Sequence, residues 1–65
     1  MITLNQATIL LTVAKQKYDV QLDFDRTQEL TEEQRKHIWW TIYNTDDKQV
    51  VKLLTNLDLI IWAKI

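Results

Sequence analysis

The 65-residue chain contains neither glycine nor proline, and this absence limits the folds open to it. At average usage of about 7% and 5%, a chain of this length would carry roughly eight such residues. Backbone positions with positive φ must then be filled by asparagine or aspartate, and tight hairpins built around glycine are not available. Because β-rich folds favour such hairpins, the sequence favours helices.

The length and composition indicate one folded domain, residues 1–65. Hydrophobic residues make up 46% of the chain and the net charge is -1, which is outside the range typical of disordered proteins. The longest apolar run, residues 59–63, is far shorter than the roughly 20 residues of a membrane span. The first residues also lack the basic segment of a signal peptide. We therefore expect a cytoplasmic protein without membrane contact.

Residues 4–18 have the spacing of an amphipathic helix. Thr3, with Gln6 three positions later, matches a capping box at the helix start. An alternation over residues 9–13 leaves a strand as the competing interpretation. The apolar residues that recur at intervals of three and four are Leu4, Ala7, Leu10, Leu11, Ala14 and Tyr18.

Residues 18–24 alternate apolar with polar side chains, which is the pattern of a strand. A single strand cannot satisfy its own backbone hydrogen-bonding groups, so it must pair with the N-terminal segment, pair with a second copy, or run as an extended connector. The sequence shows no clear partner strand. We therefore expect a connector near residues 19–26 that points Val20, Leu22 and Phe24 inward.

Two further helices are predicted in the second half of the chain. Thr31 begins a capping box that closes at Gln34, so the second helix starts there and ends near Asn44. Thr45, which two aspartates follow, is the expected N-cap of the third helix. The apolar stripe of this helix is expected to run from Gln49 to the C-terminus. Its apolar stripe consists of Val50, Leu53, Leu54, Leu57, Ile60 and Ile61.

These segments predict the fold class. We expect an all-α protein, a small three-helix domain with an extended connector. The alternative is an α+β fold with one short strand at residues 20–24.

The composition removes several classes of catalytic and cofactor site. Cysteine and serine are absent, which excludes disulfides, thiolate metal sites and cysteine or serine nucleophiles. His37 has no partner at catalytic or metal-ligand spacing, and we expect it on a helix surface. Asp23 and Asp25 resemble the start of a calcium loop, but Gln28 and Gln34 replace the glycine and glutamate that such a loop needs. We therefore expect no enzymatic activity, no cofactor and no metal site.

Charge is distributed unevenly along the chain. Residues 19–33 carry six acids against one arginine, for a charge of -5, whereas the parts before and after this segment each carry +2. We interpret the acidic segment as solvated surface and a helix N-terminus. The basic run at residues 34–37 is too short to give the electrostatic footprint of a nucleic-acid binder, so nucleic acid is not an expected partner.

Tryptophan is the clearest functional clue. Trp39 and Trp40 are about 100° apart on a helix, so a helix that buries one of them tends to expose the other. Val51, Leu59 and Trp62 lie off the stripe of the third helix and make it apolar nearly all round, which suggests an interface; a small core that uses large side chains is the alternative. The predicted interaction residues are Trp39, Trp40, Trp62, Leu57, Leu59 and Val51.

Together these features predict a non-enzymatic protein–protein interaction module. We expect a small regulator or inhibitor that binds another protein and also forms a homo-oligomer. The alternative is a small dimeric DNA-binding transcriptional regulator, whose affinity would fall steeply as salt rises. Seven isoleucines and six lysines against three alanines and two arginines suggest an AT-rich gene, as in a low-GC bacterium, phage or mobile element.

Overall fold

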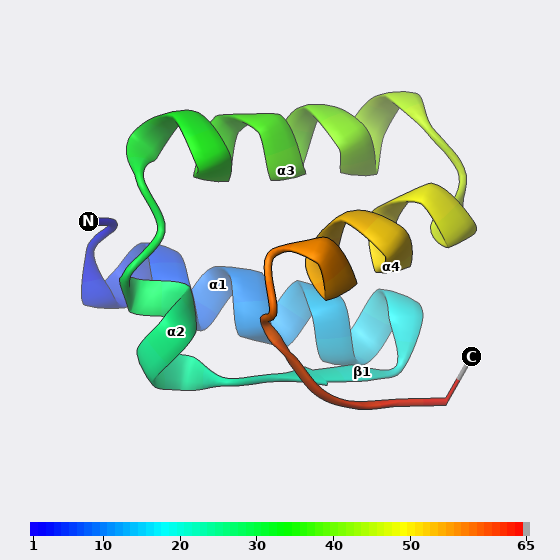
Figure 1. The fold of residues 1–65 in the computed structure, drawn as a ribbon, viewed down its shortest axis with the longest axis horizontal. Helices are drawn as coiled ribbons and strands as arrows, with labels where there is room; N and C mark the ends of the chain where they lie inside the picture. Colours follow the sequence, from blue (N-terminus) through cyan, green and yellow to red (C-terminus); the bar gives the residue numbers. More distant parts are fainter. Residues whose placement is uncertain (65) are drawn as a thin grey trace.

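The computed structural model describes residues 1–64, which form a mostly helical domain with one small sheet (Figure 1). The predicted helical character is therefore confirmed, with a two-stranded antiparallel sheet added to it. In chain order the elements are α1 (Leu4–Val13), the π-helical segment η1 (Ala14–Tyr18), β1 (Val20–Leu22), α2 (Phe24–Gln28), α3 (Glu32–Asn44), α4 (Asp47–Asn56) and β2 (Ile60–Ala63).

The first predicted helix is confirmed, and the competing strand is wrong. Thr3 caps α1 through the predicted capping box: the Gln6 backbone amide donates to Thr3 Oγ1 over 3.1 Å, and the Thr3 amide donates to Gln6 Oε1 over 2.9 Å. The last turn widens into η1, which ends where Asp19 adopts a left-handed conformation. The helix therefore spans the predicted residues 4–18.

Residues 19–26 are not the extended connector that the sequence favoured. β1 pairs with β2 near the end of the chain, so the alternative with a short strand at residues 20–24 is closer to the structure. Val20 and Leu22 are buried as expected, whereas Phe24 is exposed. The short helix α2 was not predicted. Asp23 caps it, and the Asp23 carboxylate accepts hydrogen bonds from the backbone amides of Asp25 and Arg26.

The predicted start and end of the second helix are confirmed in α3. Thr31 and Gln34 form the capping box, and the helix ends at Asn44. Thr45 is not the N-cap of the next helix. Its hydroxyl donates to the Thr41 carbonyl oxygen over 2.6 Å and its backbone amide donates to the same oxygen, so Thr45 is the C-cap of α3, and Asp46 caps α4 instead.

The third helix is much shorter than predicted. α4 ends at Asn56, and Asp58 reverses the chain direction with a positive φ of 58°. The following residues, Ile60–Ala63, form β2 instead of a further helical turn. Backbone groups of β1 need a partner strand, and β2 supplies it. The predicted stripe is therefore split: Ile60 and Ile61 belong to the sheet.

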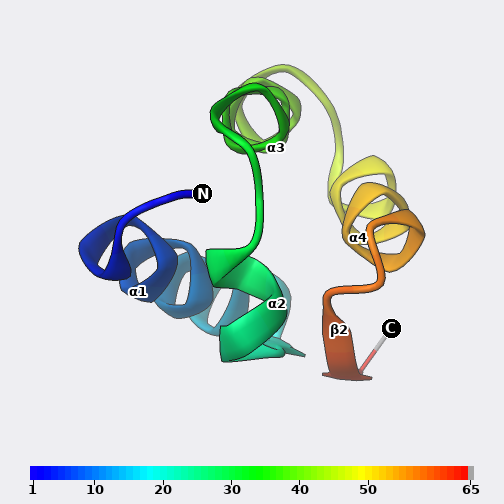
Figure 2. The same cartoon turned by 60° about the vertical axis from the view of Figure 1, so that its left-hand side comes forward.

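The core lies between α1, α3, α4 and the sheet. Figure 2 shows α3 nearly end-on, with α1 and α2 on one side below it, α4 on the other side, and β2 below α4. None of the helices within residues 1–64 has the length and apolar character needed to cross a bilayer. The buried apolar residues are Ile2, Ala7, Leu10, Ala14, Tyr18, Val20, Leu22, Leu30, Ile38, Ile42, Val50, Leu54 and Leu59.

Candidate protein-interaction surface

The six predicted interaction residues do not form one surface. Trp40 on α3 is 57% exposed and Trp62 on β2 is 48% exposed, which agrees with the expectation that at least one tryptophan faces solvent. Leu59 is buried in the core, so its assignment to an interaction surface is wrong. Trp39, Val51 and Leu57 are half-buried and pack against the core.

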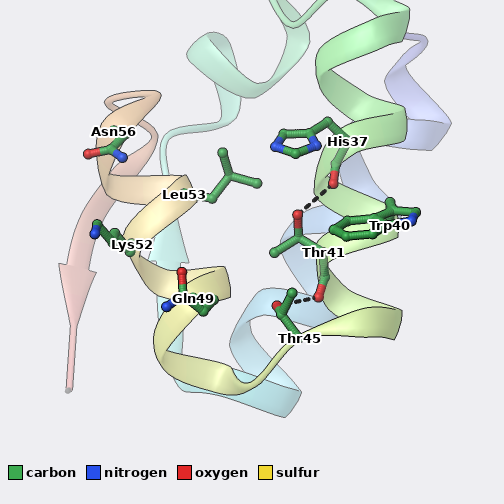
Figure 3. A pocket seen from close by; sticks show the side chains of 8 residues that line it. All are labelled: His37, Trp40, Thr41, Thr45, Gln49, Lys52, Leu53 and Asn56. Atoms are coloured by element: carbon green, nitrogen blue, oxygen red, sulfur yellow. Dashed lines mark hydrogen bonds between the residues drawn. The ribbon is translucent and has the colours of Figure 1, made fainter.

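Trp40 borders a groove between α3 and α4, which encloses about 270 Å³ (Figure 3). The two helices lie side by side there; Leu53 of α4 points toward α3, whereas Lys52 and Asn56 lie on the outer flank of α4. The lining residues are His37, Trp40, Thr41 and Thr45 of the α3 side and Gln49, Lys52, Leu53 and Asn56 of α4. The volume is below the roughly 300 to 1,000 Å³ typical of pockets for drug-sized ligands. It suits one or two side chains of a partner better.

Two nearly parallel aromatic rings form the α3 wall of the groove. The His37 and Trp40 rings lie 6.3 Å apart between centroids with an interplanar angle of 12°. Helical spacing explains the pair, because residues three apart lie on the same helix face. The expectation that His37 lies on a helix surface is confirmed.

The hydroxyl groups of the groove are already engaged. Thr41 Oγ1 donates to the His37 carbonyl oxygen over 2.8 Å, and Thr45 Oγ1 donates to the Thr41 carbonyl oxygen. Since both protons are committed to α3, neither hydroxyl is paired with a general base. The groove therefore presents a mainly aromatic and apolar surface with hydroxyl oxygens as weak acceptors.

The charge of the groove differs from that of the whole chain. Its eight lining residues include no carboxylate, although the chain as a whole has a net charge of -1. Lys52 supplies the formal positive charge, and Gln49 and Asn56 add amide groups on the same helix. Within residues 1–64 the Lys52 ammonium has no ion-pair partner. This rim is therefore open to an acidic group.

Apart from Leu53, which belongs to the predicted apolar stripe, the residues on the α4 side of the groove were not predicted from the sequence. Gln49, Lys52, Leu53 and Asn56 follow helical spacing, but their mixed polarity gives no apolar stripe to recognise. These residues form one wall of a groove only because α4 packs beside α3.

A second exposed apolar surface lies on the outer face of the sheet. Trp62 lies opposite Gln21 and Ile60 opposite Leu22, so Ile61 is the extra residue of a β-bulge. As a result Ile61 and Trp62 are both exposed although they are neighbours in a strand. The Lys15 ammonium lies 4.8 Å from the centroid of the Trp62 ring, close enough for a cation–π interaction.

The acidic segment is used mainly in local structure. Asp23 caps α2, Glu32 pairs with Arg35 over 2.9 Å, and Asp19 pairs with Lys15 over 3.3 Å. Thr27, which would be a ligand in a calcium loop, is buried and donates to the Asp23 carbonyl oxygen over 2.7 Å. Within residues 1–64 no cluster of acidic or histidine side chains is arranged to hold a metal ion.

Comparison with protein-family models, with curated proteins and with solved structures found no match to this chain.

Proposed function

We propose that this protein is a non-enzymatic module, a small regulator or inhibitor, that binds another protein through the groove between α3 and α4. The observation that carries the proposal is Trp40, a large aromatic residue that is 57% exposed at the edge of a groove. Tryptophan is enriched among the residues that dominate binding energy at protein interfaces.

The stacking of Trp40 on His37 supports this role. A side chain that is already held in one orientation loses less conformational entropy when a partner covers it. The chain therefore exposes an aromatic group in a form suited to binding.

The polar groups of the groove favour binding over catalysis. The Thr41 and Thr45 hydroxyls donate to carbonyl oxygens of their own helix, so they are not activated as nucleophiles. A DNA-binding role has less support. A strand that contacts DNA needs outward-facing side chains, but β1 pairs with β2 of the same chain and exposes only Gln21 between two buried residues.

The test is affinity capture from the cells that carry the gene, with Trp40→Ala as the variant and Tyr43→Ala as the matched control. Tyr43 is an aromatic residue on the same helix that is 77% exposed and does not line the groove. We expect the wild-type protein and Tyr43→Ala to recover the same partner protein, and Trp40→Ala to bind it at least about tenfold more weakly.

Thermal unfolding of these three proteins, with Ile38→Ala as a fourth, completes the experiment. Because Trp40 is more than half exposed, its replacement should cost about 1 kcal/mol or less, whereas a buried position such as Ile38→Ala should cost about 2 to 5 kcal/mol. Equal recovery of the partner by all variants would contradict the proposed function.

A further inference from the structure

We propose that the segment bound in the α3–α4 groove is an amphipathic α-helix of the partner that places a carboxylate against Lys52. This inference rests on the proposed function and goes further, because it states the conformation and charge of the bound segment.

The two walls of the groove have the geometry that receives a helix. The lining positions are 37, 40 and 41 on α3 with its C-cap at 45, and 49, 52, 53 and 56 on α4. Both rows follow the i, i+3, i+4 spacing of one helix face. With 13 and 10 residues, α3 and α4 are about 20 and 15 Å long. A helix of about three turns laid along the groove would contact both rows and insert one or two side chains into it.

Backbone hydrogen bonding selects a helix over an extended peptide. Both walls are helices, whose backbone groups along the groove are bonded within the helix. The Thr41 and Thr45 hydroxyl protons are also donated to α3 carbonyls. An extended peptide would find no strand edge to pair with in this groove, whereas a helix satisfies its own backbone.

The charge of the groove predicts which residues flank the apolar stripe of the bound helix. Lys52 is the formally charged residue among the eight that line the groove, and it has no ion-pair partner within residues 1–64. Gln49 and Asn56 lie one turn to either side of it and can donate amide hydrogen bonds. A glutamate or aspartate beside the apolar stripe of the bound helix therefore finds a cation and two donors on α4.

The test uses a display library of random peptides about 14 residues long, selected against the full chain. We expect the selected peptides to have apolar residues at helical spacing and an acidic residue beside them. A synthetic copy of the best peptide should shift the amide resonances of α3 and α4 and become helical on binding. Peptides with basic flanks, peptides that contain proline in the bound region, or no binders at all would overturn the inference.

Charge reversal provides the second arm. Lys52→Glu should weaken the best acidic peptide by about fivefold or more, while Lys17→Glu, which makes the same charge change outside the groove, should leave its affinity unchanged. Equal effects of the two variants would overturn the role of Lys52.

The captured natural partner separates this inference from the proposed function. If Trp40→Ala abolishes capture but Lys52→Glu leaves it unchanged, the groove binds a protein and the acidic helix is wrong. If Trp40→Ala has no effect on capture, the proposed function itself is wrong.

Discussion

At the scale of single residues, the absence of glycine has a direct consequence in the backbone. Positive φ occurs within residues 1–64 at Asp19, with φ 55°, and at Asp58, with φ 58°. The expectation that asparagine or aspartate would take such positions is confirmed. Aspartate tolerates this region better than most residues because its short side chain can hydrogen-bond locally. Each of these residues ends a helix before a strand.

Asp58 provides a test of this backbone requirement. Asp58→Val should lower the free energy of unfolding by about 1 to 2 kcal/mol, because a β-branched residue is strongly disfavoured in the left-handed region. Asp58→Asn keeps the conformational tolerance and loses only the exposed ion pair with Arg26, so it should change stability by less than about 1 kcal/mol. Urea denaturation measures both values. Equal destabilisation by valine and asparagine would show that the ion pair dominates.

Among the elements, α3 is defined by a capping signal that can be recognised in the local sequence. The Thr31–Gln34 capping box fixes its start, and the groove residues His37 and Trp40 follow one and two turns later. The position of the candidate site along α3 therefore depends on a cap that is local in sequence.

We expect Thr31→Ala to lower the free energy of unfolding by about 1 kcal/mol, because the Gln34 amide loses its side-chain acceptor. Thr31→Ser retains the hydroxyl and serves as the control, with little change expected. Chemical denaturation gives the stability, and hydrogen exchange at the first turn of α3 gives the local effect. Unchanged exchange in Thr31→Ala would contradict the importance of this cap.

At the scale of the whole molecule, the sheet leaves a second apolar surface besides the groove. Ile61 is 66% exposed and lies beside Trp62 on the outer face of the sheet. A domain of 65 residues gains little stability from its own core, and covering such a surface with a second copy would add apolar burial. The sequence expectation of a homo-oligomer therefore stays a prediction, with this surface as its location.

Light scattering after gel filtration tests the prediction. We expect the wild-type mass to rise above that of one chain at high micromolar concentration, and Trp62→Ala to move the distribution toward the monomer. Tyr43→Ala, an exposed aromatic change on another element, should leave the distribution unaltered. A strictly monomeric wild-type protein at that concentration would refute self-association.

The sequence by itself determined the elements whose signals are local. The capping boxes at Thr3 and Thr31 and the end of α3 near Asn44 were predictable, because side chains three or four residues apart make these hydrogen bonds. The exposure of one of the neighbouring residues Trp39 and Trp40 also followed from helical geometry.

Only the tertiary structure decided the secondary structure of residues 57–63. Their apolar spacing fits a continued helix, but β1 has unpaired backbone groups that a strand from this segment satisfies, and Asp58 turns the chain to reach it. That pairing buries Leu59 and exposes Ile61 and Trp62. The groove could not be predicted from the sequence either, because Lys52 and Trp40 line the same groove only when α4 packs against α3. Contacts between residues far apart in sequence leave no periodic signal in either segment alone.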